Sequence, residues 1–391
     1  MMLSTANTTA LTNLKKEWMR AGLFIILLTV AGASWLGYFW ENIYALRWLG
    51  LTTALAGWQL IALWQALPQN HRAGEDALLP NLGLGNQLSL LRGFLIAALA
   101  GFLFSPWPFG WLGWVPAFLY FFSDITDLLD GYFARIQNHV TELGAALDMN
   151  NDSWGVLVVT GLAFWYGQVP VWYLPVGLAR YFFLAGLWIR ERQGKENLEL
   201  PPSFRRRIFA GVQMGLITAM LVPLFAPPAT TIAATLFMIP FLGGFLYDWF
   251  LVTGKIDPEK GAVIFENLLS SPWMRWLPFG LRVLTAAGLA FLALLQPVDI
   301  FGLYQLPLGP LWLVLEIIVI LMLIFGVMGR LAAALALVFL GLMLKFTLLT
   351  PLHFSLLLFS TILLFTGSGA LSIWSPEEWL IYHRAGEDFH A

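Results

Sequence analysis

Residues 124–152 of this chain read DITDLLDGYFARIQNHVTELGAALDMNND. Five aspartates fall within these 29 residues, although the sequence around them is strongly apolar. Carboxylates in or beside membrane spans are costly, and they usually serve a function. Asp124, Asp127 and Asp130 recur every three residues, so they would lie along one side of a helix. The other two aspartates are four residues apart and would share one face of the next helix.

The segment between the two acidic faces, residues 137–142, is short. The two helices should therefore be antiparallel neighbours whose acidic faces converge at one edge of the membrane. Clustered carboxylates repel one another unless cations neutralise them. Oxygen ligands suit Mg²⁺, Mn²⁺ or Ca²⁺, and a chain with no cysteine and only five histidines is a poor candidate for a zinc site. Gly131 and Gly144 leave room for a ligand or backbone to approach, and Arg135 can bind phosphate oxygens.

The composition indicates a membrane protein. Of the 391 residues, 59% are hydrophobic and 11% are charged, whereas soluble domains contain roughly 25% charged residues. The net charge of -2 gives no support to a nucleic-acid partner. The first apolar run follows Lys15, Lys16 and Arg20 and is about as long as a bilayer span, so we expect a retained helix rather than a signal peptide.

Twelve stretches are long and apolar enough to predict membrane helices. The sequence therefore predicts an all-α polytopic membrane protein. The expected spans are about residues 21–40, 48–67, 87–104, 109–134, 143–167, 171–189, 207–225, 230–251, 273–295, 310–325, 329–349 and 352–373.

The charges in the loops predict the orientation. Lys and Arg concentrate in cytoplasmic loops of membrane proteins. If the N-terminus is cytoplasmic, every second loop is basic, and the loops between have almost no positive charge. The basic loops contain Arg72, Arg190, Arg192, Lys195, Arg205, Arg206, Arg207, Lys255, Lys260 and Arg330. We therefore expect both termini and the acidic site on the cytoplasmic side, in a bacterial or archaeal plasma membrane.

The acidic stretch resembles the signature of the CDP-alcohol phosphatidyltransferase family, D-x2-D-G-x2-A-R-x8-G-x3-D-x3-D. All eight fixed positions match, at Asp127, Asp130, Gly131, Ala134, Arg135, Gly144, Asp148 and Asp152. The segment Asn86-Gln-Leu-Ser89-Leu-Leu-Arg92 looks like the start of the first core helix of the family. Residues 206–213 resemble a further family segment, but Arg replaces Lys there and a Gly and a Thr are missing, which weakens an acceptor assignment from it.

The resemblance implies a site and a reaction. Two divalent cations, Mg²⁺ or Mn²⁺, would bind between Asp127, Asp130, Asp148 and Asp152 and hold the pyrophosphate of a CDP-linked lipid. The residues implied in binding CDP or phosphate are Asn86, Arg92, Gly131, Ala134, Arg135 and Gly144. Asp152 would be the general base for an acceptor hydroxyl, with release of CMP. Basic residues for a phosphorylated acceptor would be Arg180, Arg190 and Arg207.

Three parts are expected in the chain: a two-helix leader at 1–67, a six-helix catalytic domain at 68–252 and a four-helix domain at 253–391. The last part faintly resembles DoxX-like membrane proteins, which assigns it no chemistry. We expect it to pack with the leader around the catalytic domain or to support a homodimer. The hexapeptide His-Arg-Ala-Gly-Glu-Asp occurs twice, at 71–76 and at 383–388, and has no assigned role.

Several alternatives remain open from the sequence. Carboxylates within spans also serve cation or proton transporters, although no inverted repeat is evident. The acceptor could be phosphorylated, such as glycerol 3-phosphate or inositol phosphate, or it could be serine, inositol or a lipid alcohol. The donor is most simply CDP-diacylglycerol, but a soluble CDP-alcohol with diacylglycerol as acceptor is also possible. Arg190 and the run 205–207 need no cause beyond loop charge and lipid contact.

Overall fold

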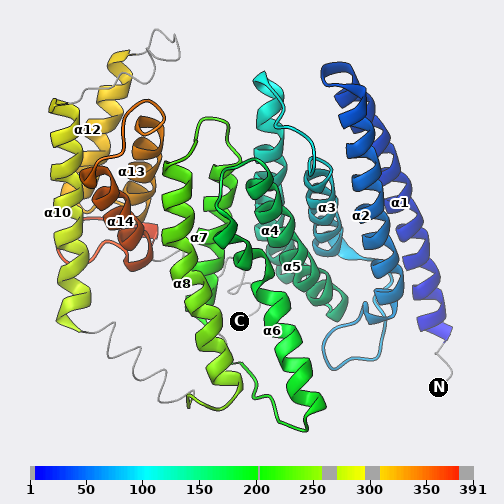
Figure 1. Ribbon diagram of the computed structural model, residues 1–391. Helices are drawn as coiled ribbons and strands as arrows, with labels where there is room; N and C mark the ends of the chain where they lie inside the picture. The colour runs from blue at the N-terminus through cyan, green and yellow to red at the C-terminus, as the bar shows by residue number, and fades with distance from the viewer. Residues whose placement is uncertain (1–4, 201–202, 258–270, 296–308, 378–391) are drawn as a thin grey trace.

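The computed structural model describes residues 5–200, 203–257, 271–295 and 309–377 (Figure 1). Twelve α-helices and no strands occur in this part of the chain, which confirms the all-α prediction. The helices are α1 (Thr5–Phe39), α2 (Asn42–Ala66), α3 (Gly83–Ala100), α4 (Val115–Ile136), α5 (Glu142–Trp165), α6 (Leu174–Arg192), α7 (Phe204–Met220), α8 (Ala229–Val252), α10 (Pro272–Leu295), α12 (Gly309–Phe325), α13 (Gly329–Met343) and α14 (Pro351–Thr366).

Five of the described helices are long and apolar enough to cross a membrane by length and composition: α1, α3, α8, α10 and the segment Val171–Arg192 that includes α6. The surface supports the same conclusion. Leu23, Phe24, Ile26 and Leu27 on α1 are each more than half exposed. Apolar patches of this size are costly in water and suit a lipid environment. The chain is therefore an integral membrane protein.

Some predicted helix boundaries were wrong for local reasons. The span expected to begin near residue 109 begins as α4 at Val115, because residues 110–114 form a short 3₁₀ turn and Pro116 occupies the first helical turn. The span expected at 329–349 ends at Met343, and α14 begins after Thr350, whose hydroxyl accepts a hydrogen bond from the backbone of His353. At the N-terminus, α1 extends some four turns before the apolar run.

The helices lie side by side and alternate in direction (Figure 1). The pair α1 and α2 forms one side of the molecule, and α10, α12, α13 and α14 form the other (Figure 1). α3 is central to the first part, since it contacts α2, α4 and α5. The linker between α2 and α3 lies at the end of the bundle where α6 and α8 also end (Figure 1).

The buried apolar side chains form two clusters. One is built from α1 to α8, and the other from α10 to α14 with Ala229 of α8. The ring of Phe365 on α14 lies 5.4 Å from that of Phe209 and 5.5 Å from that of Phe237, so the two parts of the molecule touch through aromatic contacts. The boundaries of the three expected domains stay a prediction.

The leader is fastened to α3 by direct contacts. The side-chain amide of Gln59 on α2 donates a hydrogen bond of 3.2 Å to the backbone oxygen of Leu90. The indole of Trp48 donates one of 2.7 Å to the backbone oxygen of Ala98. A Cβ atom at Gly93 would overlap the Gln59 amide, so the glycine is what allows this approach. The leader therefore packs tightly, through α2, on α3.

Candidate active site

The site begins with the close approach of α3 and α4. A Cβ atom at Gly85 would lie 2.9 Å from the backbone oxygen of Asp130 and 3.0 Å from Cβ of Ala134. Only a glycine permits this spacing without a shift of one helix. Because α3 also packs on α5, three helices meet along the faces that carry the predicted aspartates.

Three of these aspartates converge on one arginine. Nη1 of Arg92 lies 2.6 Å from Oδ1 of Asp127 and 2.9 Å from Oδ1 of Asp148. Nη2 of Arg92 pairs with Oδ1 of Asp152. One oxygen from each aspartate lies within 4.8 Å of the others. A cation from α3 is thus surrounded by carboxylates from α4 and α5.

Burial gives this cluster a direction. Arg92 is 1% exposed, whereas the side chains of Asp127, Asp148 and Asp152 are 28%, 51% and 47% exposed. The guanidinium therefore forms the floor of the cluster, and the carboxylates form its open side. A buried charge is strongly destabilising without a partner of opposite sign, and the three aspartates supply that partner.

Asp130 has a different partner. Its Oδ2 atom accepts a 2.7 Å hydrogen bond from the hydroxyl of Ser89 on α3. The backbone oxygen of Ser89 accepts a 2.7 Å bond from the side-chain amide of Asn151 on α5. Asp130 is itself buried, and it lies outside the group of three aspartates. Ser89 thus links all three helices one turn from Arg92.

Asp124 turns away from the cluster. Its Oδ2 atom accepts a 2.9 Å hydrogen bond from the hydroxyl of Thr218 on α7. Its other carboxylate oxygen is buried and has no hydrogen-bond partner. Asp124 therefore joins α4 to α7 and takes no part in the three-aspartate group.

The three-aspartate group fits a hard divalent cation. All its donors are carboxylate oxygens, which Mg²⁺ and Mn²⁺ prefer. Oxygens within 4.8 Å of one another can surround an ion whose ligand distance is about 2.1 Å. A cation bound there would share these oxygens with the guanidinium of Arg92.

The small residues of the motif accommodate neighbouring polar side chains. A Cβ atom at Gly131 would lie 3.1 Å from Nη1 of Arg135, and one at Gly144 would lie 2.6 Å from Oδ1 of Asn86. Nδ2 of Asn86 donates a 3.1 Å bond to the hydroxyl of Thr141, which caps α5 by accepting from the backbone of Gly144. The expected roles of these residues in binding CDP or phosphate stay predictions.

The turn between α4 and α5 carries His139. Its ring packs into the space left by Gly83, where a Cβ atom would contact the imidazole. Burial lowers the pKa of His139 below its ordinary value, so the ring is neutral at pH 7. A neutral ring adds no positive charge to the turn beside the acidic cluster.

The structure describes the side chains of two of the three arginines expected to bind the acceptor, Arg180 and Arg190. Arg190, at the end of α6, donates to the side chain of Asn197 at 2.9 Å and to the backbone oxygen of Glu196 at 2.8 Å, so it organises its own loop. Arg180, also on α6, has a buried Nε atom without a hydrogen-bond partner. Arg207 lies on α7, and its side chain is outside the described residues. The neighbouring Arg205 pairs with Asp248 on α8 at 2.5 Å.

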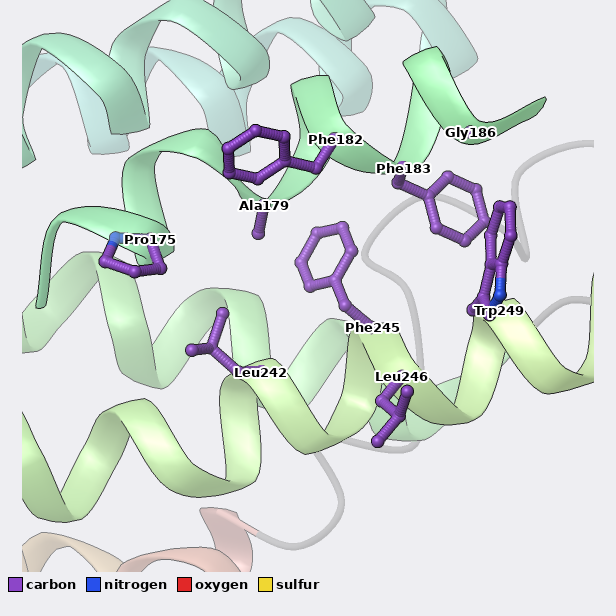
Figure 2. A pocket seen from close by; sticks show the side chains of 9 residues that line it. All are labelled: Pro175, Ala179, Phe182, Phe183, Gly186, Leu242, Phe245, Leu246 and Trp249. Carbon is purple, nitrogen blue, oxygen red and sulfur yellow. The ribbon is translucent and has the colours of Figure 1, made fainter. Parts of the chain in front are cut away.

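A separate apolar groove of about 330 Å³ lies between α6 and α8. Figure 2 shows Phe182 and Phe183 of α6 opposite Phe245 and Trp249 of α8. No charged side chain lines it. The groove suits hydrocarbon rather than the polar chemistry of the aspartate cluster.

Comparison with known families decides what the cluster belongs to. The model of the CDP-alcohol phosphatidyltransferase family matches residues 82–244. Residues 82–244 are a CDP-alcohol phosphatidyltransferase domain. The matched range runs from the start of α3 into α8 and contains the whole aspartate cluster. Neither a curated protein sequence nor a solved structure matches the chain significantly.

A CDP-alcohol phosphatidyltransferase domain transfers a substituted phosphate group from a CDP-alcohol to an alcohol, so the chain is a membrane-bound phosphotransferase. The family generally depends on a divalent metal, and the three-aspartate group is where this chain could bind one. Sequence reasoning named Ser89 within the family-like segment 86–92 but gave it no role, and it did not single out Asn151. Their signal was weak, because a serine and an asparagine in an apolar helix fit many roles besides bonding to a neighbouring helix.

Proposed function

We propose that the protein transfers the phosphatidyl group of CDP-diacylglycerol to the hydroxyl of an acceptor and releases CMP. The reaction would take place at the cytoplasmic face. It would use two divalent cations, Mg²⁺ or Mn²⁺, bound between the aspartates of α4 and α5. The observation that carries the proposal is the convergence of Asp127, Asp148 and Asp152 on Arg92 within the matched domain.

The chemistry is a substitution at phosphorus. The acceptor oxygen would form a bond to the β-phosphorus of the donor, and the bond from that phosphorus to the oxygen shared with CMP would break. CMP would leave with the electron pair. Asp152, half exposed at the open side of the cluster, would take the proton of the acceptor hydroxyl. A bound divalent cation would supply neutralisation of the charge on the phosphates.

The arginine of the cluster supports binding of an anionic donor. Arg92 gives the floor of the site a fixed positive charge, so phosphate oxygens that enter between the aspartates meet a cation from the protein as well as the metal. Arg135, which folds over Gly131 beside the cluster, supplies a second positive charge. Both residues are proposed to bind the pyrophosphate.

For the acceptor we propose a phosphorylated alcohol, such as glycerol 3-phosphate or inositol phosphate. Arg180 supports this proposal, because its charged side chain lies in an apolar helix and its buried Nε atom has no hydrogen-bond partner, so an anionic group could pair with it. Arg190 and Arg207 are weaker candidates, since Arg190 is already bonded within its loop.

The first test offers the purified protein CDP-diacylglycerol, Mn²⁺ or Mg²⁺ and a panel of acceptors, and it measures release of CMP. The panel includes glycerol 3-phosphate, inositol phosphate, serine and inositol, with diacylglycerol plus CDP-choline or CDP-ethanolamine as the reversed pairing. Release of CMP with a phosphorylated acceptor would support the full proposal. No release with any pairing would contradict it.

The matched variants in this assay are Asp148→Asn and Asp124→Asn. Asp148→Asn removes a charge from the metal group, and we expect CMP release to fall at least about 100-fold, at the upper end of what a metal-site partner contributes. Asp124→Asn keeps an oxygen that can accept from Thr218, and we expect a loss of less than about threefold. Normal turnover in Asp148→Asn would contradict the metal site. Ion flux in proteoliposomes that disappears in Asp127→Asn would favour a transporter instead.

A further inference from the structure

The linker between α2 and α3 contacts the turn that joins the two aspartate-bearing helices. This linker contains the first copy of the repeated hexapeptide, residues 71–76. We propose that His71 and Arg72 are positioning residues that hold the α4–α5 turn and thereby set the spacing of the metal-binding aspartates. The inference rests on the proposed function, because it assigns those aspartates to a metal.

Arg72 donates two hydrogen bonds to Asn138, in the turn that follows α4. Its Nε and Nη2 atoms donate to the backbone oxygen of Asn138 at 3.1 Å and 3.0 Å. Asn138 has a φ of 49°, a left-handed conformation that reverses the chain after α4. Nη1 of Arg72 lies 3.4 Å from Oε2 of Glu75, which pairs with the guanidinium. Arg72 therefore restrains the conformation that ends the helix carrying Asp127.

His71 holds the beginning of α5. Its backbone oxygen accepts a 3.0 Å hydrogen bond from the backbone N–H of Glu142, the first residue of that helix. Nε2 of the same histidine lies 3.7 Å from the carboxylate of Glu142. The first N–H groups of a helix have no partner within the helix, so an external acceptor fixes where α5 starts. Asp148 follows less than two turns later.

Hydrogen bonds of Asn70 close the linker on itself. Asn70, fully buried, donates from its side chain to the backbone oxygens of Leu79 and Asn81 at 3.1 Å and 2.8 Å. Its side-chain oxygen accepts from Asn86 at 3.1 Å, and Asn86 also bonds to Thr141 at the cap of α5. A continuous set of hydrogen bonds thus joins the linker to α3, to the turn and to the start of α5. A rigid linker can transmit position, whereas a loose one could not.

Two other features, the buried Arg282 and the groove between α1 and α3, do not identify a ligand. Arg282 is fully buried on α10 with two unpartnered nitrogens, but its guanidinium packs directly against Gly326 and leaves no space for a ligand. The groove between α1 and α3, of about 470 Å³, is lined mainly by apolar side chains together with Glu17, Arg20 and Gln87, and nothing beside it identifies an occupant. The linker contacts, by contrast, reach the turn after α4 at Asn138 and the first residue of α5, Glu142.

The test uses the full chain in lipid nanodiscs, with His383→Ala and Arg384→Ala introduced as the parent background. These two changes prevent the second copy of the hexapeptide from supplying the same side chains. The added variants are Arg72→Ala, Arg72→Lys and the control Arg47→Ala. Arg47 also donates to a loop carbonyl, that of Phe104, but it does so at the opposite end of α3.

Two readouts are independent of activity. Without metal, Arg72→Ala should speed amide hydrogen exchange at residues 137–145 about fivefold, the equivalent of one hydrogen bond, while exchange at the α5–α6 turn stays unchanged. The affinity for Mn²⁺, measured by electron paramagnetic resonance, should weaken about three- to tenfold. This is less than the roughly 10- to 100-fold effect of partners bonded directly to metal ligands, because Arg72 acts through the turn. Arg72→Lys should recover part of both effects, and Arg47→Ala should show neither.

The outcomes separate the two proposals. Unchanged exchange at 137–145, or unchanged Mn²⁺ affinity in a parent chain that binds Mn²⁺, would overturn the positioning role. A parent chain that binds no Mn²⁺ would contradict the proposed function, and the exchange measurement would still decide whether Arg72 holds the turn. Equal effects in Arg47→Ala would show a general loss of stability and would also overturn the positioning role.

Discussion

Arg92 is a buried charge that is paired with three carboxylates at once. It is buried at the floor of the site, and it holds together three carboxylates that would otherwise repel one another. The same carboxylates are the ones that fit a divalent cation. The guanidinium therefore acts as a permanent counter-ion, so that the cluster can persist in the folded chain before any metal binds.

Arg92→Gln tests this role through stability. Without divalent metal, we expect the free energy of unfolding to fall by about 1–3 kcal/mol. This is less than the 3–5 kcal/mol typical of a fully buried pair, because Asp148 and Asp152 are half exposed and water screens them. Added Mn²⁺ should raise the thermal midpoint of Arg92→Gln more than that of the wild type. The control is Arg47→Gln, which should respond to Mn²⁺ as the wild type does. Equal metal responses in all three proteins would contradict the counter-ion role.

For single residues, the sequence predicted which aspartates form the site but not which side chains donate hydrogen bonds to them. Spacing predicted that Asp148 and Asp152 share a helix face opposite Asp127, and the motif predicted Arg92 near phosphate. The structure brings those four together. The bond from Ser89 to Asp130 was not predicted, since it depends on the approach of α3 to α4 at Gly85. That approach is a property of packing between residues more than 40 positions apart in sequence.

Among the helices, α2 and α3 approach closely at Gly93. Gln59 lies directly over Gly93, and the space for its amide exists only because position 93 has no side chain. Within the residues that the structure describes, a helix lies at each of the twelve predicted spans and in the predicted order, because each apolar run is long and separated from the next by charged residues, Gly or Pro. Their contacts were not predictable, because apolar periodicity says which residues avoid water but not which helix they meet in lipid.

The pair Gln59 and Gly93 should behave as a coupled unit. Gly93→Ala places a methyl group on the Gln59 amide and should destabilise the protein by about 1–3 kcal/mol through overpacking. Gln59→Ala alone should cost about 1 kcal/mol for the lost bond to Leu90. The double variant should cost at least about 0.5 kcal/mol less than the sum.

The measurement is equilibrium unfolding in mixed micelles. Gly215→Ala is the control, because a Cβ atom there meets nothing within 4 Å, and its effect should stay within about 1 kcal/mol, the difference in helix propensity. Strict additivity of the two changes would show that Gln59 and Gly93 do not press on each other.

For the whole molecule, the orientation predicted from loop charge can be checked directly. The chain has no cysteine, so a single introduced cysteine is the only thiol. We expect Ala77→Cys, in the α2–α3 linker, to be protected from a membrane-impermeant maleimide in intact cells and labelled after permeabilisation. Phe109→Cys, before α4, should be labelled in intact cells, since Phe109 is 90% exposed and lies at the other end of α3.

Labelling in the reverse pattern would place the aspartate cluster outside the cell, where neither CDP-linked lipids nor CMP are expected. Labelling of both positions in intact cells would indicate leaky cells. A control of the wild-type chain, which has no thiol to label, gives the background.

The glycines of α3 bear on where this enzyme can be cut. The recognisable domain starts at residue 82, yet Gly93 of α3 and Gly101, directly after α3, face Gln59 and Trp48 of α2, outside that domain. In a chain reduced to residues 82–244, the small residues Gly93 and Gly101 would face lipid without the side chains of α2 that now cover them. Such a chain would also lack the contacts of the linker with the α4–α5 turn. The limits of sequence similarity and the limits of an independently folding unit therefore differ here, and shortened versions of the enzyme should keep α2 and the α2–α3 linker.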